Sequence, residues 1–220
     1  MLSAVPDRCV ADFSNVARRY LRMPMVESGM RVGLFGGSFN PPHEGHVHVA
    51  EQALMRLKLH QIWWLVTPGN PLKGHSDLAP LAERLAACQA ITSDPRMKIT
   101  ACEAVMNTRF TADTLRQITA RNSDVNFVWV MGADNLGQFH RWRRWREVAG
   151  RMPIAVVDRP GATMVLHSAA AAQILARHRI DEDDAARLPV MRPPAWVFLH
   201  GSRNPLSSTA LRAVRRKPHD

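Results

Sequence analysis

The sequence predicts an α/β fold built around a mainly parallel sheet. Short runs of β-branched and aromatic residues recur along the chain, and segments with helical periodicity lie between most of them. The expected strands cover residues 31–35, 62–66, 97–100, 125–131, 154–157 and 196–200. The expected helices cover residues 45–58, 78–91, 112–121, 135–149, 168–177 and 208–216. Ligands of such sheets bind at the carboxyl ends of the strands, so the segments that follow the strands are where function is expected.

The length and composition predict a single domain. The chain has 220 residues, 46% of them hydrophobic, which is enough for one sizeable core. We expect the domain to cover residues 30–220 and assign no role to the arm at residues 1–29. The apolar stretches are far shorter than the ~18 residues needed to cross a bilayer. The N-terminus also lacks the succession of charged, apolar and small residues that is typical of a signal peptide. The widely spaced Cys9, Cys88 and Cys102 suggest no zinc pair, so a cytoplasmic protein without a membrane partner is expected.

The chain is strongly basic, with a formal net charge of +10 and an isoelectric point of about 10.9. Such a charge attracts anions and suits either nucleic acid or a small phosphorylated substrate. Much of the excess lies at residues 141–146 and 212–217, and runs of this kind are usually solvated helix faces. We therefore expect no nucleic-acid partner.

The segment after the first expected strand has the features of a phosphate site. Its two glycines allow a tight turn and a close approach of ligand to backbone, and the helix that follows offers free N–H groups. His43 and His46 lie three residues apart, so both rings can point to one side and donate to phosphate oxygens. Surface histidines or a metal site are the alternatives, but no third N or S ligand lies nearby. The expected phosphate-binding residues are Gly36, Gly37, Ser38, Asn40, His43 and His46.

A second phosphate site is expected after the last strand. Ser207, Ser208 and Thr209 begin the final expected helix, and Arg212 follows on its next turn. A hydroxyl group that caps the helix is the alternative, and both roles can hold together. Two phosphate sites at different strand ends suit phosphoryl or nucleotidyl transfer, which depends on positioning and charge neutralisation. The sequence contains no Gly-x-Ser-x-Gly elbow and no Cys beside a plausible His base. It therefore gives no support to a covalent mechanism.

The segment at residues 36–46 resembles the His-x-Gly-His signature of the nucleotidyltransferase superfamily, whose fold is a Rossmann-like, doubly wound α/β domain with helices on both faces. Over residues 31–212 the chain looks most like the bacterial nicotinate-nucleotide adenylyltransferases. The resemblance implies adenylyl transfer from ATP to nicotinate mononucleotide, which gives deamido-NAD and pyrophosphate. It also implies that His43, His46 and Arg212 carry charge on the departing pyrophosphate, with Mg²⁺ bridging ATP phosphates and no metal site in the protein.

The same resemblance assigns further residues to ATP. Ser207, Thr209 and Arg212 match the family's Ser-x-Thr-x-x-Arg motif, and Gly132 and Asp134 match a Gly-x-Asp motif at the nucleotide. For Asp134, a cap on the next helix is the alternative. Asn40 stands where many members have Asp, which removes a negative charge beside the phosphates.

The acceptor site is expected from four features. Trp142 matches the aromatic residue that stacks on the pyridine ring, although helical spacing with Phe139 and Trp145 also suits core packing. Thr111 matches a helix start that meets the nicotinate carboxylate, or is a plain N-cap. Lys73 matches the family's loop after the second strand, which lies near a substrate phosphate. Arg159 matches the family's Arg-Pro-Gly turn.

Other functions remain open. Nicotinamide-mononucleotide and phosphopantetheine adenylyltransferases are the nearest alternatives, because their acceptor sites differ from a nicotinate site in only a few contacts. Phe110 in place of the usual Tyr and Arg143 in place of a second aromatic affect these acceptor contacts most. A non-catalytic nucleotide- or nucleic-acid-binding protein is the alternative from another class. The partners expected are ATP and nicotinate mononucleotide, and a homo-oligomer is compatible with the sequence.

Overall fold

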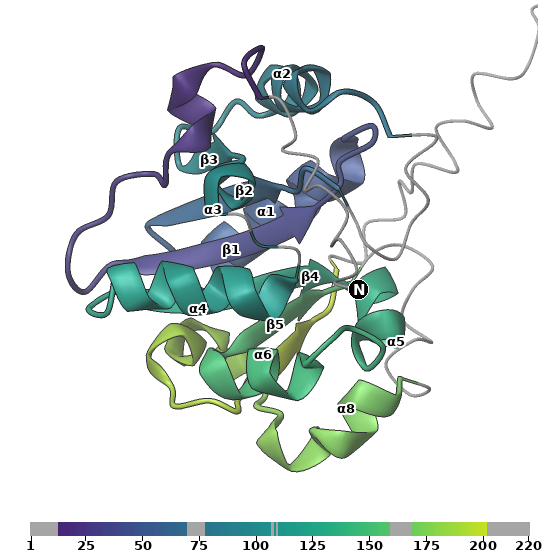
Figure 1. The fold of residues 1–220 in the computed structure, drawn as a ribbon. Helices are drawn as coiled ribbons and strands as arrows, with labels where there is room; N and C mark the ends of the chain where they lie inside the picture. The colour runs from purple at the N-terminus through teal and green to yellow at the C-terminus, as the bar shows by residue number, and fades with distance from the viewer. Residues whose placement is uncertain (1–12, 70–77, 107, 109, 159–168, 202–220) are drawn as a thin grey trace, which may run out of the picture.

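The protein forms one parallel sheet. The structure, a computed structural model, describes residues 13–69, 78–106, 108, 110–158 and 169–201 (Figure 1). The strands are β1 (Arg31–Gly37), β2 (Gln61–Val66), β3 (Met97–Thr100), β4 (Asn126–Gly132), β5 (Ile154–Val157) and β6 (Trp196–Leu199). Their order is β3-β2-β1-β4-β5-β6, and each pair of neighbours is parallel. The predicted Rossmann-like fold class is therefore confirmed.

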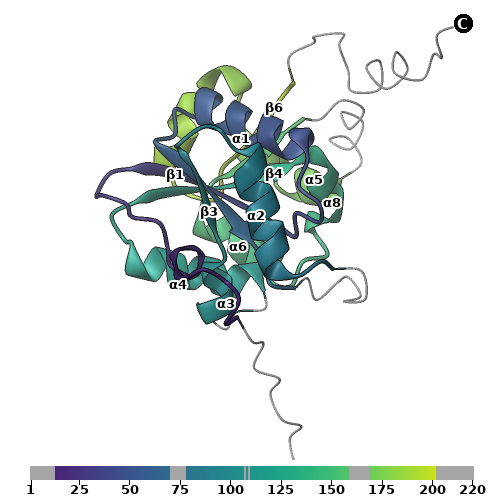
Figure 2. The same ribbon diagram turned by 90° about the horizontal axis from the view of Figure 1, so that it is seen from above.

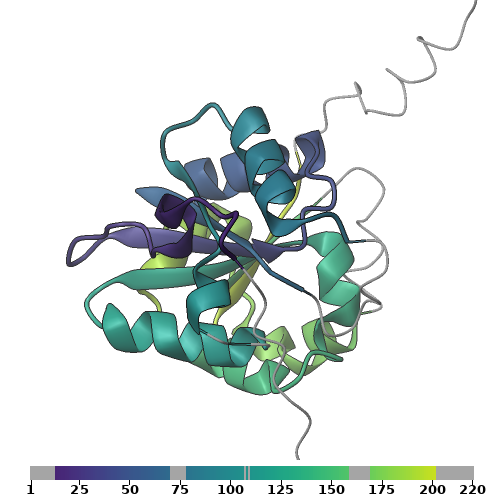
Figure 3. The ribbon, with the colours of Figure 1, turned by 45° about the horizontal axis from the view of Figure 1, so that its top comes forward.

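Helices cover both faces of the sheet. The α-helices are α1 (Glu44–Arg56), α2 (Leu81–Ile91), α3 (Cys102–Met106), α4 (Thr111–Arg121), α5 (Ala133–Phe139), α6 (Trp145–Arg151) and α8 (Ala170–Ile174). Short 3₁₀ helices are η1 (Arg18–Leu21), η3 (Ala176–His178) and η4 (Glu182–Val190). Figures 2 and 3 show α1 and α2 on one face and α4 and α6 on the other.

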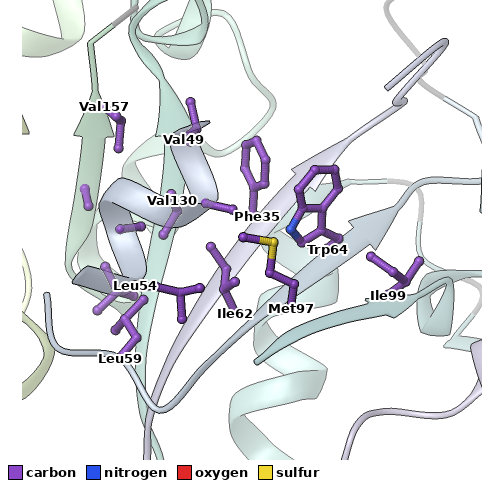
Figure 4. Packing of buried hydrophobic residues seen from close by; sticks show 14 of the residues in the cluster. Phe35, Val49, Leu54, Leu59, Ile62, Trp64, Met97, Ile99, Val130 and Val157 are labelled. Carbon is purple, nitrogen blue, oxygen red and sulfur yellow. The ribbon is translucent and has the colours of Figure 1, made fainter. Parts of the chain in front are cut away.

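Strand side chains alternate between two buried layers. Phe35 of β1 and Trp64 of β2 lie in the layer that holds Val49 and Leu54 of α1 (Figure 4), whereas Leu34 and Trp63 pack on the opposite face. Every residue of β2 is buried. A strand covered on both faces needs apolar residues at successive positions, which explains the continuous apolar run at residues 62–66.

The sheet has one topological switch point, between β1 and β4. From β1 the chain moves outward through β2 to β3, then returns to form β4 on the other side of β1. The helices that follow β1 and β4 therefore leave in opposite directions, and a crevice opens at the carboxyl ends of these two strands. The predicted phosphate segment lies at this edge.

The structure differs from the predicted elements in several places. The single helix expected at residues 135–149 is two helices, α5 and α6, because residues 140–144 leave the helix and Arg144 has a left-handed φ of 57°. The short α3 was not expected, since five residues give little periodicity. The acidic residues that begin at Glu182 form η4, which includes Pro189 and for which no element was predicted.

Part of the N-terminal segment packs on the domain. Val16 and Tyr20 lie in the core on the α1 face. The backbone oxygen of Tyr20 accepts hydrogen bonds from the N–H of Ala101 at 2.7 Å and from Oγ1 of Thr100 at 3.1 Å. The short helix η1 (Arg18–Leu21) is thus held against the end of β3. Within the described part of the chain, no helix has the length and apolar character that a bilayer span requires.

Candidate active site

The two strands at the switch point lead directly into helices. β1 ends at Gly37 and β4 at Gly132, and the pairing of Phe35 with Val130 sets the two ends level. The next helices, α1 and α5, begin at Glu44 and Ala133. The free N–H groups at the first turns of both helices therefore meet at one edge of the sheet, where an anion is favoured.

His43 and His46 form a reciprocal cap at the start of α1. Nδ1 of His43 accepts from the N–H of Gly45, and Nδ1 of His46 accepts from the N–H of His43, both at 3.2 Å. The ring centroids are 3.9 Å apart. The structure thus brings both rings to one side of the helix start, and their contact with phosphate stays a prediction.

The cap determines which nitrogen of each ring can donate. A backbone N–H is always the donor, so Nδ1 of His43 and His46 must be the acceptor. In a neutral imidazole the other nitrogen then carries the hydrogen. Both rings therefore present Nε2–H, the group that can donate to a phosphate oxygen.

Aromatic packing holds His46 in place. Phe39, in the loop between β1 and α1, is buried with a left-handed φ of 46°, and its ring stacks on Trp64 with centroids 4.9 Å apart. The ring of His46 lies edge-on to Phe39 at 5.1 Å. Phe35 completes the group at 5.4 Å from both Phe39 and Trp64. The direction of the His46 ring is thus determined by the core beneath it.

The two glycines have a role other than the expected tight turn. Gly36 and Gly37 are still part of β1. A Cβ on Gly36 would lie 2.5 Å from Cη2 of Trp129, and one on Gly37 would lie 3.1 Å from the ring of Phe39. Small residues are therefore required here to make room for two large rings beside the crevice, which corrects the expectation of a turn.

Ser38 and Asn40 connect the loop after β1 to α2 and to the segment before it. The backbone oxygen of Ser38 accepts from Nη1 of Arg84 at 2.7 Å. Oδ1 of Asn40 accepts from the N–H of Ala79 at 3.2 Å. Their role at the ATP phosphates stays a prediction. The loop between β1 and α1 is held by these two hydrogen bonds.

Asp134 lies at the start of α5 but is not its cap. The N-cap of α5 is Gly132, without a side-chain hydrogen bond, and Asp134 is exposed in the first turn. The alternative that Asp134 caps the helix is therefore wrong. An exposed carboxylate at the edge of the switch point remains compatible with the predicted nucleotide contact.

Thr111 is the first residue of α4, whose N-cap is Phe110. The alternative of Thr111 as a plain N-cap is thus also wrong. No side chain caps this helix, so its first N–H groups have no such partner among the described residues. Cζ of Arg143 lies 4.7 Å from the centroid of the Phe110 ring, so the loop that carries Trp142 contacts the start of α4.

Trp142 is half-buried in the loop between α5 and α6. Its ring lies edge-on to Trp129, with centroids 6.0 Å apart, and to Phe139 at 5.4 Å. Phe139 and Trp145 are buried in the core, at 1% and 6% exposure. The core alternative therefore applies to these two residues, whereas Trp142 is held by its edge and keeps exposed surface.

Five predicted site residues lie outside the described residues. They are Lys73, Arg159, Ser207, Thr209 and Arg212. The second phosphate site and the two basic acceptor contacts therefore stay predictions.

Two charged residues near this edge were missed by the sequence analysis. Arg84 is only 2% exposed, and Leu81, Arg84, Leu85 and Cys88 form the buried side of α2. This spacing places Arg84 on the apolar face, which is a signal that the sequence does contain. Burial raises the pKa of Glu103 to about 7, and hydrogen bonds from Thr114 and Thr67 oppose the increase. No sequence pattern identifies Glu103.

The comparisons with known proteins agree with this geometry. The family model described as cytidylyltransferase-like matches residues 34–214, which include both predicted phosphate segments. The fold and the site thus define a nucleotidyltransferase of this family. A Plasmodium falciparum nicotinic acid mononucleotide adenylyltransferase, solved in complex with APC, has a similar fold with a TM-score of 0.57 at 16% identity. The match covers 87% of this chain and 86% of the other.

Curated relatives define the family more closely. A protein of Rhizobium johnstonii named "Probable nicotinate-nucleotide adenylyltransferase" is 57% identical over 190 residues, which cover 86% of this chain and 96% of that protein. A relative of the same name from Agrobacterium fabrum is 59% identical over 183 residues, covering 83% and 98%. The chain belongs to the nicotinate-nucleotide adenylyltransferase family.

Proposed function

We propose that this protein transfers the adenylyl group of ATP to nicotinate mononucleotide, with deamido-NAD and pyrophosphate as products. The observation that carries the proposal is the 57–59% identity over nearly the full length of nicotinate-nucleotide adenylyltransferases. The site geometry supports it independently, because a doubly wound sheet presents two helix starts and a histidine pair at its switch point.

The reaction requires positioning and charge neutralisation rather than a nucleophile on the protein. A phosphate oxygen of the acceptor attacks the α-phosphorus of ATP in line, and negative charge develops on the departing pyrophosphate. The Nε2–H groups of His43 and His46 are suited to donate to this charge, because their direction is fixed before the substrate arrives. Ser207, Thr209 and Arg212 would supply the second phosphate contact.

The remaining predicted residues divide between nucleoside and acceptor. Asp134 would select the ribose or adenine of ATP from the start of α5. The exposed surface of Trp142 supports stacking on the pyridine ring, and the uncapped start of α4 at Thr111 supports binding of the carboxylate. Lys73 and Arg159 would contact the acceptor's phosphate side.

Mg²⁺ fits this site as an ion carried by the nucleotide. Among the described residues, no group of three His, Cys, Asp or Glu side chains is placed to hold a metal ion. Mg²⁺ prefers phosphate and water oxygens in any case, and it usually keeps several waters. Bound in this way, it would neutralise phosphate charge.

The test offers one acceptor at a time to the purified protein with ATP and Mg²⁺. Pyrophosphate release is measured with nicotinate mononucleotide, nicotinamide mononucleotide and phosphopantetheine. The expected result is the highest kcat/KM with nicotinate mononucleotide. A clear preference for another acceptor contradicts the substrate, and no release with any acceptor contradicts the reaction.

A further inference from the structure

Arg84 places its buried guanidinium group among backbone oxygens from three segments. Nη1 donates to the oxygens of Ser38 at 2.7 Å and Thr67 at 2.8 Å. Nε donates to the oxygen of Ala79 at 2.9 Å, and Nη2 approaches that of Pro68 at 3.4 Å. One side chain of α2 therefore joins the loop after β1, the end of β2 and the segment before α2.

The positive charge of Arg84 is costly where it lies. Within the described ranges it has no carboxylate partner, and burial lowers the pKa of its guanidinium from the ordinary value. Burial of a charge that is compensated only by neutral carbonyl groups reduces stability relative to an apolar residue. A role beyond packing explains why an arginine stands here.

Two of the joined segments follow the neighbouring strands β1 and β2 at the carboxyl edge of the sheet. Ser38 lies between β1 and the histidine pair of α1, so its position affects the predicted phosphate contacts. Thr67 follows β2, and its Oγ1 donates to the backbone oxygen of Gly69 at 3.0 Å. Arg84 thus links the loop on the predicted ATP side of the crevice to the end of the neighbouring strand β2.

We propose that Arg84 is a positioning residue that holds the loop after β1 at a fixed distance from the end of β2, so that ATP and the acceptor lie in line for transfer. The inference rests on the proposed function. Misplacement of reacting groups by about 1 Å costs on the order of 10²-fold in rate. If the loop after β1 is no longer fixed to the end of β2, kcat should therefore fall more than substrate affinity. The planar fork of arginine spans several oxygens at once, whereas the ammonium of lysine is a point charge.

The test is Arg84→Lys, which keeps the charge and loses the fork. In the wild-type protein, activity with nicotinate mononucleotide first establishes the proposed function. The variant is then assayed well below its melting temperature. We expect kcat to fall about 10-fold or more, with KM for ATP and for the acceptor changed less than about threefold. A folded variant with kcat within about twofold of wild type, or with its loss confined to KM, overturns the proposal.

Arg151→Lys is the matched control, because Arg151 is a partly buried helix arginine that ends α6 just before the amino end of β5. It lies at the opposite edge of the sheet, and its kcat is expected to stay at the wild-type value. If Arg84→Lys does not fold, the proposal is tested by a crystal structure of the wild-type protein. The crystal would contain a non-hydrolysable ATP analogue and nicotinate mononucleotide. Arg84 must then still bond both Ser38 and Thr67, and loss of either contact overturns the proposal.

Discussion

At the residue scale, His46 is the residue whose loss should separate catalysis from binding. His46→Ala is expected to lower kcat about 10²-fold, with a smaller change in the KM for ATP, because a fixed donor to the developing charge is lost. Steady-state kinetics with nicotinate mononucleotide measures both constants. His48→Ala is the control, since two positions along a helix turn a side chain to nearly the opposite face. Equal losses in the two variants would contradict the assignment.

Gly36 should tolerate no side chain. In Gly36→Ala the new Cβ meets the rigid ring of Trp129 at 2.5 Å, so the free energy of unfolding should fall by about 1–3 kcal/mol. Gly150→Ala in α6 is the opposite case, because no atom lies within 4 Å of its added Cβ. That change should stabilise the helix by about 0.5–1 kcal/mol. Urea unfolding of both variants compares them, and equal effects would refute the packing explanation.

Trp142 and Trp145 should differ although they are three positions apart. Trp142→Ala is expected to raise the acceptor KM about fivefold and leave the KM for ATP near its wild-type value, since stacking contributes roughly 1 kcal/mol. Trp145→Ala should instead lower the free energy of unfolding by about 3 kcal/mol or more, because Trp145 is 6% exposed. Kinetics and thermal melts distinguish the two. Unfolding of Trp142→Ala would mean that Trp142 is a core residue.

At the element scale, Glu103 of α3 should make stability depend on pH. Burial raises its pKa in the folded protein from 4.5 to about 7. A raised folded-state pKa gives stability that is complete below the unfolded value and is lost as the pH rises through the folded value. The protein should therefore be less stable at about pH 8 than at about pH 5, by on the order of 2 kcal/mol from this group.

Glu103→Gln tests this dependence, because glutamine does not titrate. Urea unfolding at the two pH values should show a smaller difference in the variant than in the wild type. Glu51→Gln on the exposed side of α1 is the control and should keep the wild-type difference. An unchanged pH dependence in Glu103→Gln would show that Glu103 is not the titrating group.

The elements themselves were predicted unevenly. The strands lie within two residues of their expected ends, because residues covered on both faces must be apolar in continuous runs. The break between α5 and α6 was not predicted, since Phe139, Trp142 and Trp145 keep a helical spacing although the backbone leaves the helix. At this break the ring of Trp142 contacts Trp129 of β4, a long-range contact that the local pattern does not contain.

At the scale of the whole molecule, residues 13–29 should behave as part of the domain. Tyr20 is 8% exposed and lies in the core on the α1 face. Tyr20→Ala is expected to lower the free energy of unfolding by about 2 kcal/mol or more and to leave kcat unchanged at low temperature. Chemical unfolding and the pyrophosphate assay measure the two effects. A variant as stable as wild type would show that the segment contributes little to the fold.

The sequence by itself determined the fold class and the family, and it predicted the phosphate segment at residues 36–46. These follow from local information, because strand and helix periods and a continuous motif are legible without long-range contacts. The same is true of the histidine pair, since three positions along a helix start bring both rings to one side.

Only the tertiary structure decided what supports that segment. Gly36 is small because Trp129 of another strand lies against it, and Arg84 reaches loops that are 16 to 46 positions away in sequence. The exposure that separates Trp142 from Trp145 is likewise absent from their spacing. Contacts between distant segments depend on how the sheet orders its strands, and that order is a property of the folded chain rather than of any local pattern.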